Sequence, residues 1–149
     1  MSAAERVKSL QESVEEAQRR LELRRMRSQQ ALLAEDTFVE RFASKGYLFT
    51  RESEQRMRAQ LLGHPTPQTP DMGFTSPVVI CGQQCNWVEF KDYFGFPDNP
   101  FVARKEKKQL RKYLLAVGQG AVVHTIGFQC GYPNIEGVAV LRCERCSRD

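Results

Sequence analysis

The residues of this chain best suited to chemistry are two short-spaced cysteine pairs, Cys81 with Cys85 and Cys143 with Cys146. Each pair can form a tight turn that directs two thiolates at one ion, and such pairs are the usual ligands of a structural zinc site. Gly82, inside the first pair, allows the positive φ that such a turn often needs. The spacing therefore predicts one Zn²⁺ ion bound by these four cysteines.

Two other interpretations of the cysteines stay open. All five cysteines could be small buried hydrophobic side chains in a reducing compartment. Disulfides are the second alternative, and they require an oxidising compartment. The first residues are charged and include no apolar stretch of the kind that secretory signals have, so we expect an intracellular protein, either cytoplasmic or nuclear.

His124 is a candidate for a supporting role at the metal. If residues 121–130 and 137–143 pair as an antiparallel hairpin about the turn between them, His124 lies opposite Cys143. There it would be an alternative zinc ligand, a hydrogen-bond donor to a ligand, or an ordinary core histidine. A shift of one residue in the register would turn His124 to the other face of the hairpin.

No catalytic grouping is recognised in the sequence. The chain has two histidines, no glycine-rich phosphate loop and no carboxylate pair beside the expected metal site. On one regular strand Cys130 and His124 would be ~20 Å apart, too far for a nucleophile and its base. We therefore expect a protein that is not an enzyme and that has no small-molecule substrate.

Positive charge is concentrated on one predicted helix of a chain whose formal net charge is +4. Asn99 and Pro100 are typical of a helix start, and Gly118 is typical of the position after a helix end at Val117. The apolar stripe of this helix leaves its cations largely outside: Arg104, Lys105, Lys107, Lys108, Arg111 and Lys112. Such a face can bind the phosphates of RNA or DNA, although a solvated surface is the simpler alternative.

The N-terminal residues predict a long helical arm. Ser2 and Glu5 have the spacing of a capping box, and no Gly or Pro occurs before Gly46. A coiled-coil-like seam of about two heptads is formed by Val7, Leu10, Val14, Ala17 and Leu21. A helix with so narrow an apolar stripe needs a partner, so we expect residues 1–63 to bind a second copy of the chain or another protein.

These signals divide the chain into three regions and predict an α+β fold. Residues 1–63 form the arm, with a second helix from about Arg51 to Leu62. Residues 64–77 hold four of the seven prolines and are expected to be a linker. Residues 78–149 are expected to form a small zinc-stabilised domain of order β-α-α-β-β.

The elements of that domain are predicted from its start and stop signals. A first strand covers residues 77–80. Asn86 and Glu89 have a second capping-box spacing, which predicts a helix from Trp87 to Phe94. The basic helix follows, and residues 121–130 and 137–143 are expected to form the final hairpin.

Two classes of function are therefore open. The first is a non-catalytic, zinc-binding interaction or assembly protein whose arm self-associates or recruits a partner. The second is a small basic regulatory nucleic-acid-binding protein, an architecture found among viral regulators. A membrane protein is not expected, because no apolar run approaches the ~20 residues of a membrane span.

Overall fold

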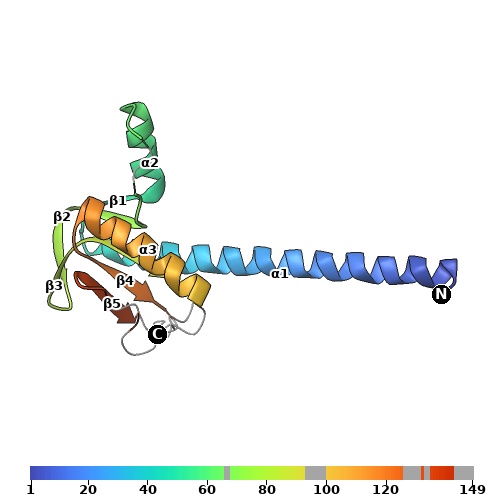
Figure 1. The fold of residues 1–149 in the computed structure, drawn as a ribbon. Coiled ribbons are helices and arrows are strands. Elements are labelled where there is room, and N and C mark those ends of the chain that lie inside the picture. Colours follow the sequence, from blue (N-terminus) through green and yellow to red (C-terminus); the bar gives the residue numbers. More distant parts are fainter. Residues whose placement is uncertain (66–67, 93–99, 126–131, 133–134, 143–149) are drawn as a thin grey trace. The chain divides into compact units, whose positions relative to one another are not determined.

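The computed structural model describes residues 1–65, 68–92, 100–125, 132 and 135–142. It is a mixed α+β structure with a long N-terminal helix and a five-stranded sheet (Figure 1). The chain divides into two compact units, Met1–Phe38 and Val39–Asp149. The predicted region boundaries after residues 63 and 77 both fall inside the second unit. Among the described residues, no helix is long and apolar enough to cross a membrane.

The long helix α1 covers Ala3–Ser44. Its capping box is present: the Ser2 amide donates to Glu5 Oε2 at 2.5 Å, and the Glu5 amide donates to Ser2 Oγ at 3.2 Å. The helix ends before Gly46, whose φ is +85°. A long helix at the N-terminus is thus confirmed, whereas a coiled coil stays a prediction.

In the described part of the chain, five strands form one sheet in the order β1-β2-β3-β4-β5. The strands are β1 (Phe49–Arg51), β2 (Met72–Ile80), β3 (Gln83–Lys91), β4 (Gly120–His124) and β5 (Val138–Arg142). The pairs β1/β2 and β2/β3 are antiparallel, while β3/β4 and β4/β5 are parallel. Helix α2 (Glu52–Leu61) connects β1 to β2, and α3 (Pro100–Val117) lies between β3 and β4. Both helices match the predicted ranges closely.

The helix predicted from Trp87 onward is wrong, because Trp87–Lys91 belongs to β3. Trp87 is buried on the face that α3 covers, and Val88 and Phe90 are buried on the other. A strand covered on both faces reads as a continuous apolar run, which sequence periodicity does not distinguish from a short buried helix. The predicted residues beyond Asp92 lie outside the described ones.

The predicted antiparallel hairpin is also wrong, because β4 and β5 are parallel. Gly120 is aligned with Val138, and His124 with Arg142. The order β-α-α-β-β is therefore replaced by β2-β3-α3-β4-β5. The sequence between the two strands was interpreted as a tight turn, but a parallel pair needs a longer crossover. Residues 126–130 of the predicted strand lie outside the described part of the chain.

Much of the predicted linker is structured. From Met72 onward it forms β2, and Thr69 and Pro70 just before it are buried. Pro77 is accommodated because the β2/β3 register shifts between Gly73 and Val78. Such an irregularity leaves a position where a strand residue need not donate a ladder hydrogen bond.

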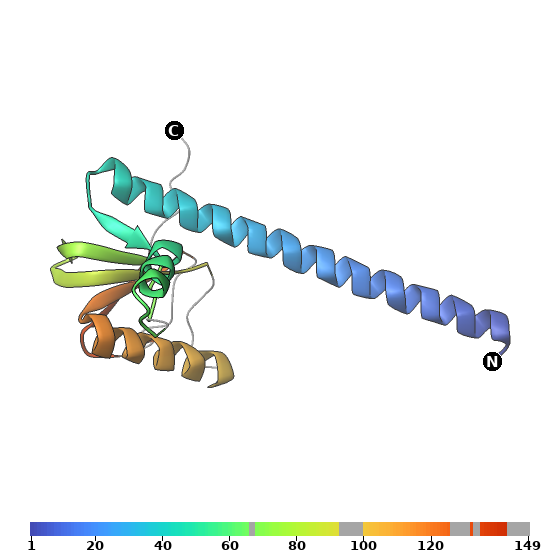
Figure 2. The same cartoon turned by 90° about the horizontal axis from the view of Figure 1, so that it is seen from above.

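The core lies on the face of the sheet that α3 covers (Figure 2). Its fully or nearly buried members are Trp87, Leu110, Tyr113, Val122 and Val138. The Trp87 and Tyr113 rings meet edge to face, with centroids 5.2 Å apart. On the opposite face Phe74 packs against Phe42, from the last turns of α1, and against Phe49. Both faces of the central strands are therefore covered.

Gly120 is where this core tolerates no side chain. A Cβ there would lie 2.1 Å from Trp87 Cε2. The indole is also held by its Nε1 donor bond to the Gly118 carbonyl at 2.7 Å, so it has little freedom to move.

We expect Gly120→Ala to lower the free energy of unfolding by about 3 kcal/mol, the upper range for an overpacked core. Urea denaturation followed by circular dichroism measures this. The matched control is Gly63→Ala, where φ is +67° but no atom lies within 4 Å of the new Cβ. There only the backbone cost of about 1 kcal/mol is expected. Equal losses would contradict the packing described.

Candidate functional site

Polar side chains gather at one end of the sheet, where the parallel strands β3 and β4 finish and β2 begins. Lys91, the last residue of β3, is aligned with His124, the last residue of β4. Asp71 immediately precedes Met72, which pairs with Val88. The carboxyl ends of parallel strands are common ligand-binding positions in open sheets. This end of the sheet is therefore a candidate functional site.

Asp71 and Glu89 hold each other in place. The Asp71 amide donates to Glu89 Oε2 at 3.1 Å, and the Phe90 amide donates to Asp71 Oδ2 at 2.8 Å. Glu89 is only 5% exposed, and Asp71 is half-buried. The two carboxylates are thus fixed side by side, each by the backbone of the other's segment.

Lys91 brings a positive charge to the same place. Residues 89 and 91 of a strand point to the same face, so the two side chains lie together. Lys91 Nζ is 3.4 Å from Glu89 Oε1, and it donates to Gln109 Oε1 of α3 at 2.9 Å. Helix α3 therefore fixes the ammonium group beside the carboxylate pair. We call Asp71, Glu89 and Lys91 the acidic site.

The segment that carries Asp71 is anchored by two helices. Gln55 of α2 donates to the carbonyls of Thr50 and Pro70, at 3.0 and 3.2 Å. The Tyr113 hydroxyl of α3 donates to the Thr69 carbonyl at 3.3 Å. Burial raises the pKa of Tyr113, and the nearby carboxylates raise it further, so the phenol stays neutral.

The pKa of Glu89 is raised by its position in this arrangement. Burial, with the charge of Asp71 as the second cause, raises the pKa of Glu89 from 4.5 to about 7, even though Lys91 opposes the shift. Its carboxylate is therefore close to half-protonated at neutral pH. A bound cation would remove the repulsion between the two carboxylates and favour their ionised forms.

This raised pKa predicts how stability depends on pH. Between pH 4.5 and about 7 the unfolded chain has released the Glu89 proton while the folded chain still holds it. The free energy of unfolding should therefore fall as the pH rises through this window, by up to about 3 kcal/mol. Glu89→Gln should lack this loss, so its advantage over the wild type should grow from near zero at pH 4 to its maximum at pH 8. Urea titrations in a chelating buffer measure both curves, and an advantage independent of pH would refute the assignment.

A second polar cluster lies beside the acidic site, because His124 is aligned with Lys91 in the sheet. His124 Nε2 is 3.1 Å from Glu106 Oε1, and the Tyr132 hydroxyl donates to Glu106 Oε2 at 2.7 Å. His124 and Glu106 are both buried. Burial, followed by Glu106, raises the pKa of Tyr132. His124 thus has the contacts of a core histidine. The hairpin that placed it opposite Cys143 does not form, and Cys143 lies outside the described residues, so a role of His124 at the metal stays a prediction.

The cysteines are described only in part. Cys81 is exposed in the β2–β3 turn with φ +49°, and Cys85 is buried, with Sγ 3.5 Å from the Gln83 carbonyl. Burial raises the pKa of the Cys85 thiol, and Cys81 adds to the shift. Cys130, Cys143 and Cys146 lie outside the described residues. Within the described residues, no three His, Cys, Asp or Glu side chains converge as metal ligands.

The sheet register bears on the four-cysteine hypothesis. Gln83 donates to the carbonyls of Gly120 and Gly137, so the first cysteine pair lies at the end of the sheet where β4 and β5 begin. Arg142, which precedes the second pair, lies at the opposite end, aligned with His124. The length of β5, ~17 Å, separates the two ends. A single zinc ion shared by both pairs therefore finds no support in the described residues and stays a prediction, to be tested by metal analysis.

The basic helix is confirmed as α3, and its two faces have different roles. Its buried face carries Ala103, Glu106, Leu110 and Tyr113. The predicted phosphate-binding residues Arg104, Lys105, Lys108, Arg111 and Lys112 are exposed, and Lys107 is half-buried. Gln109, a half-buried residue of the same helix, contacts Lys91, so α3 itself adjoins the acidic site.

The predicted self-association residues of the arm are exposed. Val7, Leu10, Val14 and Leu21 all lie in the first compact unit, on the helix α1. These side chains are therefore accessible to a partner, and self-association through them stays a prediction.

The acidic site is the feature that the sequence analysis missed. The signal was present: a Thr-Pro-Asp segment before an apolar strand, followed by Glu89-Phe90-Lys91. A Glu and a Lys two residues apart share one face only in a strand, and Glu89 had been interpreted as part of a helix cap.

The architecture and the site define an α+β protein with a carboxylate pair and a lysine at the carboxyl end of a mixed sheet. A family model, described as TPD, protein of unknown function with a TPD sequence motif, matches residues 4–142, and the chain belongs to this family. Thr-Pro-Asp occurs once in the chain, at residues 69–71, so the motif that the description names coincides with the segment carrying Asp71. Neither the curated proteins nor the solved structures provide a match.

Proposed function

We propose that this protein is a divalent-cation-dependent hydrolase of phosphodiester bonds in nucleic acid. The observation that carries the proposal is the acidic site, in which two braced carboxylates lie beside a lysine whose ammonium group is held by α3. An enzyme was not expected from the sequence, where this grouping was not recognised.

The ligand chemistry favours Mg²⁺ or Mn²⁺. These cations prefer oxygen ligands, and Mg²⁺ is commonly bound by one or two carboxylates that leave room for water and for substrate phosphate. Asp71 and Glu89 supply such a pair.

The same residues suit hydrolysis of a phosphodiester. Water bonds to phosphorus through its oxygen and gives up one proton, the bond from phosphorus to the leaving oxygen breaks, and that oxygen takes up a proton. A divalent cation at the pair would stabilise the negative charge that develops on the phosphoryl oxygens. Lys91 adds a second positive charge there, and its bonds to Glu89 and Gln109 fix its position before substrate binds.

The exposed face of α3 supports nucleic acid as the substrate. Cations along one helix can contact successive phosphates without reading the bases. Nucleic-acid binding, one of the two functions expected from the sequence, would then serve to hold the substrate for hydrolysis.

Cation binding tests the proposal before any substrate is known. Isothermal titration calorimetry with Mg²⁺ and Mn²⁺ should detect binding to the wild type. Asp71→Asn should weaken it by about tenfold or more, because one of two anionic ligands is lost. Glu54→Gln, at an exposed position of α2, is the control and should bind normally. Binding that is absent, or unaffected by Asp71→Asn, would remove the proposal.

A second role, recruitment or assembly through the arm, is favoured by the exposed apolar residues of α1. This role was expected from the sequence for a non-catalytic, zinc-binding protein. Recruitment through the arm does not depend on a zinc ion, and it is compatible with catalysis by the second compact unit. Catalysis and recruitment would then belong to different compact units of one chain.

A further inference from the structure

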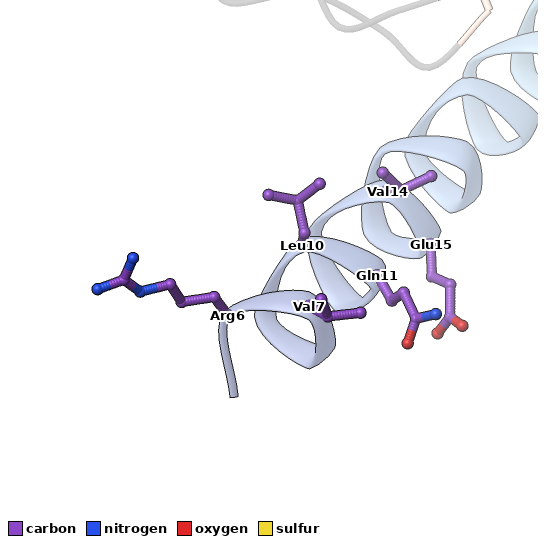
Figure 3. A pocket seen from close by; sticks show the side chains of 6 residues that line it. All are labelled: Arg6, Val7, Leu10, Gln11, Val14 and Glu15. Carbon is purple, nitrogen blue, oxygen red and sulfur yellow. The ribbon is translucent and has the colours of Figure 1, made fainter. Parts of the chain in front are cut away.

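The first compact unit exposes an apolar row along one side of its helix. The row consists of Val7, Leu10, Val14 and Leu21, which are 58, 70, 50 and 60% exposed, with Ala17 between the last two. Figure 3 shows Val7, Leu10 and Val14 on successive turns. Together with Arg6, Gln11 and Glu15 they line a shallow depression with a volume of about 530 Å³. The spacing of three and four residues is the seam spacing that a second helix can cover.

The charges beside the row indicate which helix can cover it. With Val7, Val14 and Leu21 at the first seam position of each heptad, the two flanking positions are occupied by Arg6, Gln11, Ser13, Gln18, Arg20, Arg25 and Arg27. None of these is acidic. The glutamates of this stretch lie on the outer positions, at Glu5, Glu12, Glu15, Glu16 and Glu22.

Arg20 has an ion pair within the helix, at 2.6 Å from Glu16. Both side chains are more than half exposed, so the pair is weak and can exchange partners. The flanking positions thus carry positive charge at Arg6 and from Arg20 to Arg27, with uncharged side chains between them.

A second copy of the chain is a poor occupant of this surface. In a parallel pair, Arg20 of one helix would face Arg25 of the other. In an antiparallel pair centred near Val14, Arg6 would face Arg20 at both ends. Like charges beside a seam oppose association and select against the wrong partner.

We propose that this row is the docking site for an amphipathic helix of another protein whose flanking positions carry Glu or Asp. The apolar residues supply the contact area, and the arginines select the partner by charge. The proposal is independent of the acidic site, which lies in the other compact unit.

Two synthetic three-heptad peptides test it against the full-length chain. Both carry Ile and Leu at the seam, and their flanking positions are all Glu in one and all Lys in the other. Fluorescence anisotropy should give a Kd for the Glu peptide about tenfold or more below that for the Lys peptide. Arg20→Glu with Arg25→Glu should shift the preference toward the Lys peptide.

Matched variants locate the binding. Leu10→Ala with Val14→Ala should weaken binding of the Glu peptide by about tenfold or more, because both remove seam area without breaking the helix. Leu23→Ala is the control, since Leu23 is similarly exposed but lies off the row, and its Kd should stay within about twofold. Equal affinity for the two peptides, failure to bind the Glu peptide, or sedimentation as a dimer that Leu10→Ala with Val14→Ala dissociates would each overturn the proposal.

Discussion

Asp71→Asn and Glu89→Gln are each expected to reduce Mg²⁺-dependent cleavage of nucleic acid by about 10³-fold or more, equivalent to roughly 4 kcal/mol of lost transition-state stabilisation. Each substitution removes one of the two anionic cation ligands. The fold should survive, because the Asn and Gln side-chain oxygens can still accept the amide bonds from Phe90 and Asp71. Single-turnover cleavage of a labelled oligonucleotide measures the rate.

Glu136→Gln is the matched control for these variants. It removes one exposed carboxylate from the loop before β5, and its cleavage rate should equal that of the wild type. Circular dichroism spectra should agree among all variants. Activity in Asp71→Asn within a few fold of the wild type would mean that the carboxylate pair only braces β2 against β3.

Reversing the charge of Lys107, Lys108, Arg111 and Lys112 to Glu should abolish binding of nucleic acid while leaving the sheet intact. Three of these side chains are exposed and Lys107 is half-buried, so the packed face of α3 is little disturbed. For the wild type, four to six phosphate contacts predict a log-log salt slope of about −3 to −5. Salt titrations with single- and double-stranded oligonucleotides measure it.

The control for charge reversal is a variant with the same net charge change elsewhere. Lys8, Arg19, Arg24 and Lys45 are all exposed residues of α1 or its end, and their replacement by Glu should leave most of the affinity. Equal losses from the two sets would mean that binding follows overall charge rather than the face of α3. Undiminished binding in the α3 variant would exclude this face as the substrate-binding surface.

Local signals were enough to predict the three helices of the described residues. Ser2 with Glu5 started α1, Pro100 started α3, and glycines after the helix ends limited each of them. A signal of the same kind failed at Asn86 and Glu89, where burial on both faces of the sheet outweighs the capping-box spacing. The exposed row of the arm was likewise predictable, because a helix with few tertiary contacts keeps the pattern of its sequence.

Strand pairing was not predictable in the same way. Trp87–Phe90 is buried on both faces, so its alternation is hidden. The parallel pairing of β4 with β5 depends on a crossover that no local signal specifies. The acidic site depends on both. Asp71 and Glu89 are 18 residues apart and meet only through the irregular register of β2 against β3.

The sequence therefore predicted a site only at the cysteines, whose spacing is typical of metal ligands. The structure brings together Asp71, Glu89 and Lys91, whose spacing in the sequence matches no known motif considered in the sequence analysis. Carboxylates and lysines are common on protein surfaces, so their presence in a sequence does not indicate a site. Their burial and their contacts, which only a structure gives, distinguish a site from ordinary surface charge. Glu89 is 5% exposed and has a raised pKa, and neither property can be predicted from the distribution of charged residues along the chain.

Cleavage by the purified full-length chain tests the central claim most directly. Labelled single-stranded DNA, double-stranded DNA and RNA are incubated with the wild type in Mg²⁺, in Mn²⁺ and in a chelator, with Asp71→Asn as a parallel sample. We predict that at least one substrate is cleaved with either cation, that the chelator stops the cleavage, and that Asp71→Asn does not cleave. No cleavage of any substrate by the wild type, or cleavage that continues in the chelator and in Asp71→Asn, would contradict the assignment of Asp71, Glu89 and Lys91 as a metal-dependent catalytic site.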